Sequence, residues 1–189
     1  SSITAAQNVV VRTLDDKDND IDGDGATPGT GQKLLTEVIT VGSLSSASFS
    51  AGTPTPGFED TATLKFTTAG QVEEGGKIQL LLPEISFLVQ SSWEFTSPAV
   101  TITSLVDNSK PRASASFSSR TLTMILQHGS SLAQNSTYEF HISNMRTPSS
   151  IVKNNTVALW TSDSLDKTID TAASIDEAEI QAVIVDTPL

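Results

Sequence analysis

The sequence predicts an all-β protein folded as an antiparallel β-sandwich. Apolar and polar residues alternate over most of the chain, which is the period of a strand with one buried face. Glycine, proline, serine and asparagine clusters separate the alternating segments at short intervals, and no segment carries a convincing helical stripe. Many short strands divided by turns favour two antiparallel sheets packed face to face.

Each predicted strand places apolar side chains at alternate positions. In chain order the inward residues are Ala62, Leu64 and Phe66; Ile78, Leu80 and Leu82; Val100, Ile102 and Leu105; Ala113, Ala115 and Phe117; Leu122, Met124 and Leu126; Tyr138, Phe140 and Ile142; and Val157, Leu159 and Thr161. Ser118-Ser119 predicts a hairpin turn, and Ile180–Val185 a last strand that is apolar on both faces. Short helices are predicted only at Ser174–Ala178 or around Pro83–Leu88. This pattern predicts an immunoglobulin-like sandwich with extended terminal strands.

The chain is predicted to divide into an N-terminal strand with an acidic loop or linker, residues 1–32, and a sandwich domain, residues 33–189. Ile3–Val11 is apolar and β-prone, and a long loop separates it from the body. Such a strand pairs either with its own sheet or with the open edge of the next copy, which gives a head-to-tail, non-closing contact and a homopolymer. Ile180–Val185 allows the same two outcomes.

An acidic cluster follows the N-terminal strand. Asp18, Asp20 and Asp22 alternate directly before Gly23, which matches the first half of a calcium-binding EF-hand loop. The second half is absent, because Gly29 stands where the bidentate glutamate belongs, and the flanking segments read as β. We expect a structural Ca²⁺ inside a β protein, with Asp15 or Glu37 as further ligand candidates. The expected ligands are Asp16, Asp18, Asp20, Asp22 and Asp24. The alternative is a solvated, flexible linker.

Charge and composition exclude several classes of partner. The formal net charge is −11, of which residues 15–24 (six Asp, one Lys) contribute −5 and residues 163–186 (seven acids, one Lys) contribute −6. This balance argues against nucleic acid and anionic membranes and predicts acidic surfaces near both ends. The sequence has no apolar run of membrane-spanning length, so we expect no membrane insertion. Cysteine is absent, so disulfides and thiolate metal sites are excluded.

The chain is rich in hydroxyl side chains. Serine and threonine make up 50 of 189 residues, and with few aromatic residues this favours an extracellular or cell-surface β module. Asn135-Ser136-Thr137 and Asn154-Asn155-Thr156 are N-glycosylation sequons beside predicted strands, so Asn135 and Asn154 are the expected sugar sites, although short sequons also arise by chance. Thr53 and Thr55, within Ser43–Pro56, are candidates for O-linked sugar.

No catalytic constellation is visible in the sequence, and we predict that the chain is not an enzyme. His128 and His141 are interpreted as surface residues, and the glycine-rich Gly23–Gly31 lacks the lysine of a phosphate loop. Trp93 and Trp160 either pack in the core or stack on sugars. The carboxylates Glu59, Asp60, Glu73 and Glu74 are placed at turns, and nothing indicates a raised pKa of the kind that a glycosidase acid needs.

Several phrases between Phe58 and Ile175, about 60% of the chain, support a family resemblance. They are Ala62–Phe66, Gly75–Pro83 (GGKIQLLLP), Ser119–Leu126 (SRTLTMIL), Tyr138–Pro148 (YEFHISNMRTP) and Val157–Thr161 (VALWT). These phrases resemble modules found in tandem in large secreted proteins of algae and other microbial eukaryotes. The chain also resembles the subunits of glycosylated helical fibrils from pond water, which are β-sandwich domains linked end to end. That resemblance implies an N-glycosylated filament subunit with the acidic loop as an ion site.

The expected function is therefore that of a structural subunit of an extracellular glycoprotein filament, which assembles with other copies of itself. The alternative is a calcium-dependent adhesin or carbohydrate-binding module from a larger secreted protein. A glycoside-acting enzyme is a more distant third reading.

Overall fold

The computed structural model describes residues 8–11, 13–14, 20–22, 32–35, 40–83, 93–149 and 156–176. The chain divides into two compact units, Ser1–Val41 and Gly42–Leu189. Throughout the described ranges the regular structure is β-strand, and no helix is present. Those ranges accordingly hold no helix with the length and apolar character needed to cross a membrane.

The first unit contains two short antiparallel ladders. Strand β1 (Asn8–Val11) pairs with β4 (Gln32–Leu35), with Asn8 opposite Leu35 and Val11 opposite Gln32. Between them along the chain, β2 (Thr13–Leu14) pairs with β3 (Asp20–Asp22). The β2–β3 ladder lies within the stretch of sequence between β1 and β4. The predicted acidic loop or linker therefore contains a short strand at Asp20–Asp22, which pairs with Thr13-Leu14.

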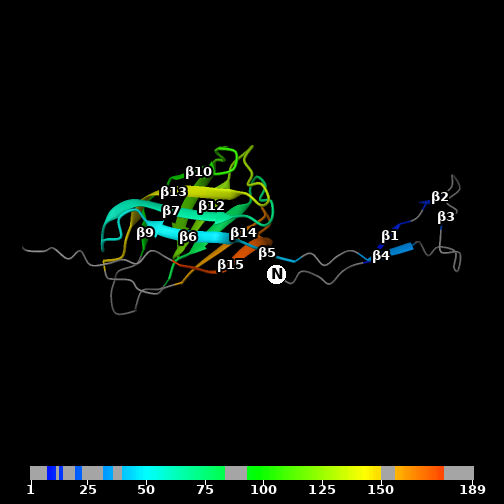
Figure 1. Ribbon diagram of the computed structural model, residues 1–189, viewed down its shortest axis with the longest axis horizontal. Helices are drawn as coiled ribbons and strands as arrows, with labels where there is room; N and C mark the ends of the chain where they lie inside the picture. The colour runs from blue at the N-terminus through cyan, green and yellow to red at the C-terminus, as the bar shows by residue number, and fades with distance from the viewer. Residues whose placement is uncertain are drawn as a thin grey trace, which may run out of the picture. The chain divides into compact units, whose positions relative to one another are not determined.

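The second unit contains two sheets, the first with five strands (Figure 1). Its order is β10 (Val100–Ser104), β13 (Thr137–Arg146), β7 (Glu59–Thr67) and β6 (Ser45–Ala51), while β9 (Glu94–Phe95) pairs with the end of β13. All of these pairings are antiparallel. The two edges of this sheet are therefore β10 and β6.

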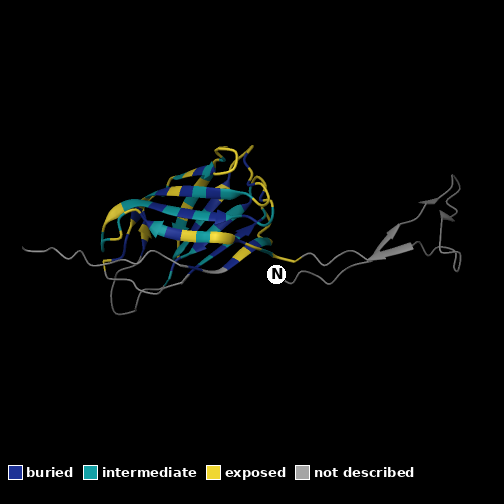
Figure 2. Cartoon of the chain, in the orientation of Figure 1, coloured by how far each residue is buried: buried dark blue, intermediate teal, exposed yellow. Residues whose placement is uncertain are grey.

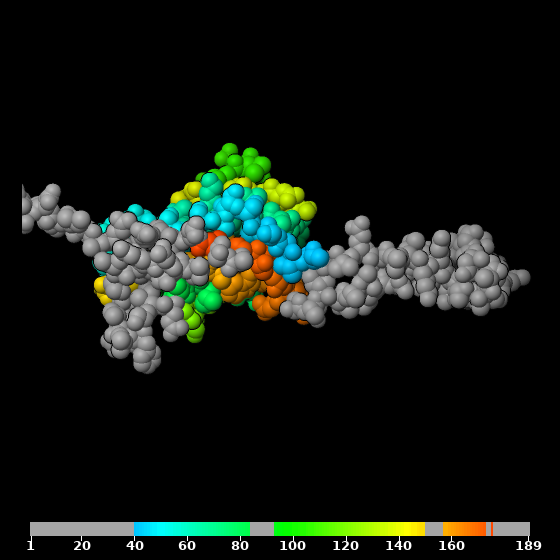
Figure 3. Space-filling model, turned by 60° about the horizontal axis from the view of Figure 1, so that its bottom comes forward, coloured from blue at the N-terminus to red at the C-terminus, as the bar shows by residue number. Residues whose placement is uncertain are grey.

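The second sheet has six strands. Their order is β11 (Ala113–Ser118), β12 (Thr121–Leu126), β8 (Lys77–Leu81), β14 (Thr156–Ser162), β15 (Thr168–Asp176) and β5 (Gly42–Ser43). The pairings are antiparallel except that of β5 with β15, which is parallel. Figure 3 shows the blue atoms at the start of this unit against the orange atoms of β15.

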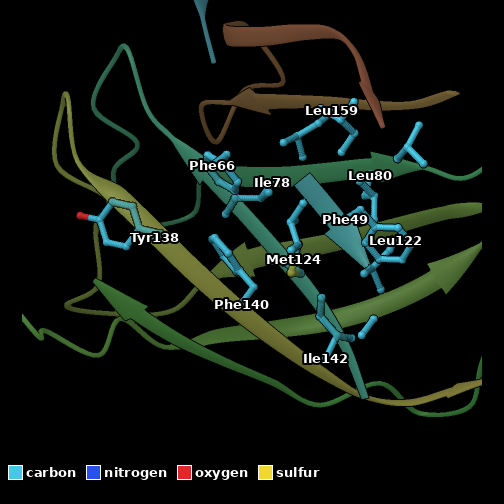
Figure 4. Close-up of a cluster of buried hydrophobic side chains, with 14 of the residues drawn as sticks. Phe49, Phe66, Ile78, Leu80, Leu122, Met124, Tyr138, Phe140, Ile142 and Leu159 are labelled. Atoms are coloured by element: carbon cyan, nitrogen blue, oxygen red, sulfur yellow. The ribbon is translucent and has the colours of Figure 1, made fainter. Parts of the chain in front are cut away.

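One hydrophobic core lies between the sheets. Figure 2 shows buried and less buried residues alternating along the strands, as expected for strands with one inward face. The close-up in Figure 4 shows side chains from both sheets meeting, and Phe66 and Phe140 stack with ring centroids 5.1 Å apart. The fully buried residues include Leu64, Phe66, Phe140 and Ile142 from the first sheet, and Ile78, Leu80, Leu122 and Met124 from the second. The predicted all-β, sandwich-like arrangement is confirmed at this level.

The predicted hairpin around Ser118-Ser119 is also confirmed. Strands β11 and β12 pair so that Ser118 lies opposite Thr121, which leaves Ser119 and Arg120 as a two-residue loop. Both loop residues have positive φ, 48° and 65°, which is the signature of the type I′ turn that suits right-twisted strands. Leu105, predicted inside a strand, instead follows β10 and is exposed.

The strands of the second unit that were not predicted are β5, β6, β9 and β15. β6 lies inside Ser43–Pro56, which we interpreted as a candidate for O-linked sugar. The helix predicted at Ser174–Ala178 is wrong for Ser174–Asp176, because these residues end β15 and pair with β14. The alternative helix near Pro83 and the strand Ile180–Val185 lie outside the described residues.

The buried carboxylate of Asp170, on β15, contacts two other segments of the second unit. They are Gly42 at its start and the Ala69-Gly70 turn after β7. Asp170 has no exposed surface, although we predicted residues 163–186 to be an acidic surface. Its carboxylate accepts hydrogen bonds from the amide of Gly70 at 2.9 Å and that of Ala69 at 3.3 Å, and the Thr161 hydroxyl donates at 3.4 Å. Gly42 packs so closely that a Cβ there would overlap this carboxylate. Backbone amides thus stabilise a charge that has no cationic partner among the described residues.

Candidate functional site

The predicted calcium residues belong to the first unit. Asp20 and Asp22 lie in β3, where they pair with Leu14 and Thr13. Asp16, Asp18 and Asp24 lie outside the described residues, as do Asp15 and Glu37. In the part of the chain that the structure describes, no three acidic or histidine side chains come together as a metal site would require. Because only Asp20 and Asp22 of the expected ligands fall within the described residues, the calcium site stays a prediction.

The clearest candidate for a functional surface is the pair of sheet edges formed by β10 and β11. Each ends its sheet, and no further described strand pairs with it. Val100–Ser104 and Ala113–Ser118 contain no charged residue, proline or glycine. Soluble β proteins usually protect edge strands with charges, prolines, bulges or very short strands, because the free N–H and C=O groups of an edge pair readily with another chain. The two strands themselves lack those protections, and the nearest charges and proline are Lys110, Pro111 and Arg112, directly before β11.

The opposite side of the sandwich is protected. Strand β6 carries an irregularity between Ser45 and Ser48, and Ser46 has a φ of 50°. Its neighbour β5 has only two residues, after which the chain crosses to the other sheet through Leu44, whose amide donates to the Thr171 carbonyl at 2.9 Å. A bulge and a very short strand are two of the common devices against edge pairing. The two sides of the molecule are therefore unequal, and only one favours strand addition.

A groove of about 330 Å³ runs beside the β10 edge. Val100–Ile102 line one side, and the segment Lys110–Ala113, which leads into β11, lines the other together with Gln127. The segment is held in place by its backbone, since the Arg112 amide donates to the Ser130 hydroxyl at 2.9 Å and the Gln127 amide donates to the Arg112 carbonyl at 2.8 Å. The side chains of Lys110 and Arg112 form no ion pair with the described part of the chain.

The turn before this basic segment, residues 104–109, is held by several hydrogen bonds. The Ser104 amide donates to the Ser109 carbonyl at 2.9 Å, and the Asn108 amide donates to the Ser104 carbonyl at 3.1 Å. Hydrogen bonds from the Ser104 hydroxyl and then the Ser109 amide lower the pKa of Asp107 to about 2. The Asp107 carboxylate is thus hydrogen-bonded within its own turn. The backbone that leads to Lys110 is held by the hydrogen bonds of that turn.

A hollow of about 660 Å³ lies where β7, β9 and β13 meet, beside the irregularity of β13 between Ile142 and Met145. Its lining is polar and consists of Glu59, Asp60, Thr61, Glu94, Thr96, Ser97, Ser143, Asn144 and Arg146. Hydrogen bonds from the Thr53 hydroxyl and then the Thr61 amide lower the pKa of Asp60. A lowered pKa is the reverse of what a general acid needs, so Asp60 is a poor proton donor at neutral pH.

The histidines lie at the surface, as we interpreted them. The His128 side chain is 96% exposed, and its Nδ1 lies 2.8 Å from Glu74 Oε1. The Gly129 amide, followed by the His128 ring, lowers the pKa of Glu74. His141 Nε2 lies 3.0 Å from Glu139 Oε1 on the outer face of the first sheet. His141 also has the Thr63 hydroxyl 3.4 Å from its Nδ1, so a hydroxyl and a carboxylate flank its ring. This group lies on an exposed strand face and lines none of the described hollows, so it has no pocket in which to hold a substrate.

The two tryptophans have different positions. Trp93 is buried and packs edge-on against Phe49, with ring centroids 5.6 Å apart. Trp160 is half-buried on the outer face of the second sheet, and its indole N–H donates to Gln79 Oε1 at 2.9 Å. Thr123 and Thr171 stand beside this pair in the strand register. An aromatic ring fixed by a hydrogen bond and surrounded by hydroxyl groups is a feature of sugar-binding faces as well as of sheet packing.

The candidate glycosylation residues that the structure describes differ in how exposed they are. Asn135 is exposed, has a φ of 53° and lies two residues before β13, as the sequon predicted for a site beside a strand. Its side chain makes no hydrogen bond with the rest of the described chain. Asn154 lies outside the described residues. Thr53 and Thr55 are half-buried, and the Thr53 hydroxyl donates to Asp60 Oδ2 at 2.6 Å, so that oxygen is engaged within the fold.

Sequence reasoning missed the β10–β11 side and its basic segment. The phrase Lys110-Pro111-Arg112 between two strand patterns is visible in the sequence, and proline beside two cations is a usable signal of an irregular basic turn. What the sequence cannot show is that the flanking strands end two different sheets, because that order depends on β13 and β12.

Comparison of the chain with protein-family models, with curated proteins and with solved structures finds no match.

Proposed function

We propose that this chain is a structural subunit of an extracellular glycoprotein filament, an immunoglobulin-like sandwich that joins the next copy head to tail by strand pairing. One observation carries the proposal: β10 and β11 present uncharged, unprotected edges on the same side of the sandwich. Such edges persist in a soluble chain when a partner strand covers them.

The N-terminal unit supports the same reading. Its described strands pair only with each other, as two ladders of at most four residue pairs. A two-stranded hairpin alone is marginally stable in water, and three or more strands with a buried face are needed for independent stability. The apolar segment Ile3–Val11 therefore gains stability if a further sheet receives it.

The proposal is tested by negative-stain electron microscopy of the purified chain, free of added ligand. A filament subunit gives regular fibrils whose amount rises with protein concentration above a threshold. Dispersed single particles at every concentration, in buffer with and without Ca²⁺, contradict the proposal.

We also propose that Asn135 and Asn154 carry N-linked glycans when a eukaryotic cell secretes the chain. The observation that supports Asn135 is its exposed side chain next to β13, where a bulky sugar displaces no packed group. Intact-glycopeptide mass spectrometry should find both peptides modified, and the Asn135→Gln variant should lose only its own glycan. Wholly unmodified peptides from secreted material contradict this prediction.

The acidic residues Asp16, Asp18, Asp20, Asp22 and Asp24 are proposed to hold a structural Ca²⁺. A ligand that binds only the folded chain at 100 times its Kd adds about 2.7 kcal/mol to the free energy of unfolding. Calorimetry should show a lower melting temperature after chelation, and the Asp20→Asn/Asp22→Asn variant should lose this response. The calcium proposal is contradicted if chelation changes neither the melting temperature nor the protease cleavage between residues 12 and 32.

A second candidate function is carbohydrate binding, as in an adhesin module. The observation that favours it is the Trp160 ring on the outer face of the second sheet, whose N–H donates to Gln79. Base- or sugar-like ligands stack on such rings, and the loss of the ring removes the stacking. A glycan array should then show binding that the Trp160→Ala variant loses and the Thr171→Ala variant keeps. No binding by the unmodified chain rules this candidate out.

A further inference from the structure

The groove beside β10 has the features of an acceptor for an extended acidic segment. We propose that it receives the N-terminal segment of a second copy of this chain, with Ile3–Val11 antiparallel to β10 and Asp15 and Asp16 beside Lys110 and Arg112. The inference rests on the proposed function and assigns the acceptor surface, the direction of the strand and the charges that hold it.

The backbone of β10 supplies the first part of the argument. Val100–Ser104 pairs with β13 along one side over five residue pairs, so alternate N–H and C=O groups on its other side are free for a new strand. The local turn uses both groups of Ser104 there, because its amide donates to the Ser109 carbonyl and its carbonyl accepts from the Asn108 amide. The groups left for a new strand are those of Val100 and Ile102. Pro111 lies across the groove and has no N–H to donate, so the segment on that side does not compete for the edge.

Charge supplies the second part. The groove lining includes Lys110 and Arg112 but no carboxylate, and neither cation has an ion-pair partner in the described residues. Arg12 directly follows the apolar segment, and residues 15–24 then carry six aspartates and one lysine, so residues 12–24 together have a net charge of −4 (six Asp against Arg12 and Lys17). Opposite charges across an interface speed encounter and fix the register of the partners. The acidic run of the next copy is the best complement that the chain itself offers.

The position of the cations sets the direction of the incoming strand. Lys110 and Arg112 line the groove beside Val100–Ile102, the first half of β10. The donor must therefore place its acidic, C-terminal end near the start of β10, which requires antiparallel pairing. With Val11 opposite Ile102, Asp15 lies two positions past Val100, roughly 7 Å along the strand, within reach of a lysine or arginine side chain.

Charge reversal in the full chain tests the inference. The Lys110→Glu/Arg112→Glu variant should need roughly tenfold more protein to form fibrils, since two attractive pairs become repulsive. The Asp15→Lys/Asp16→Lys variant should show a similar defect, and the chain that carries all four substitutions should recover. The control is Lys167→Glu, which reverses an exposed charge on the β14–β15 turn and should leave fibril growth unchanged. Thermal unfolding verifies that each variant is folded.

Engineered disulfides test the pairing directly, because the natural chain has no cysteine. Thr101→Cys combined with a cysteine at Val10, Val11 or Arg12 should give disulfide-linked ladders under mild oxidation, with the Arg12 combination favoured because Arg12 lies opposite Thr101 in the proposed register. Thr171→Cys, on the opposite side of the sandwich, should give none with the same donor cysteines.

The outcomes separate the two proposals. If the natural chain forms no fibrils, the filament function fails. If fibrils form and the four-substitution chain is as defective as its parents, or the Thr101 combinations give no ladder, the acceptor groove is wrong while the filament function stands. Rescue together with the ladder supports the assignment.

Discussion

Removal of residues 1–13 is expected to abolish fibril growth and leave a folded monomer. The truncation deletes β1 (Asn8–Val11) and the apolar residues before it, but no residue of the two large sheets. A strand beside β10 can pair with the N–H and C=O groups of Val100 and Ile102, about four backbone hydrogen bonds, and at about 1 kcal/mol each their loss weakens association roughly a thousandfold. Sedimentation velocity and negative-stain imaging of the truncated chain measure this result.

The matched control is a chain that lacks residues 177–189, which include the alternative donor Ile180–Val185. That chain should polymerise normally, and a synthetic peptide of residues 1–13 should slow the growth of the full-length protein. Normal fibrils from the chain without residues 1–13 would show that the N-terminal strand is not the connector.

Alternation of apolar and polar residues was sufficient to predict the central strands. β7, β8, β12, β13 and β14 each bury one face between the sheets, so local sequence directly reports their environment. The tight hairpin between β11 and β12 was equally readable, because its two strand patterns are separated by two residues. In these segments the local preference and the tertiary packing agree.

The strands that sequence reasoning missed contain few large apolar residues. β6 reads Ser45-Ser-Ala-Ser-Phe-Ser-Ala51, and only Phe49 and Ala51 are buried along it, so its composition resembles a linker. In β15 the inward position between Thr168 and Ala172 holds Asp170, which breaks the apolar pattern. The amides that satisfy Asp170 lie 100 and 101 positions earlier in the chain, beyond what any local pattern can reveal.

The candidate site was less predictable than the fold. The exposed position of Asn135 before a strand could be predicted because a sequon is a local motif and the strand after it was visible, and its glycosylation stays a prediction. The identity of β10 and β11 as edges could not, because strand order is decided by long-range pairing with β13 and β12. Likewise, the sequence does not reveal that Lys110 and Arg112 line a groove, because the other side of that groove is formed by Val100–Ile102.

Replacement of Asp170 by alanine is expected to lower the free energy of unfolding by about 2 kcal/mol, because it leaves two partly buried amides without an acceptor, each at the lower end of the cost of about 1–3 kcal/mol for such a group. The carboxylate is fully buried and holds the Ala69-Gly70 turn against β15. Asp170→Asn, which keeps one carbonyl oxygen but turns a donor toward the amides, should lose an intermediate amount. Asp166→Ala, an exposed carboxylate in the preceding turn, should change stability by less than about 1 kcal/mol although it removes an ion pair to Lys77. Urea denaturation of the four proteins measures the differences, and equal midpoints for Asp170→Ala and Asp166→Ala would show that the buried carboxylate contributes nothing beyond a surface charge.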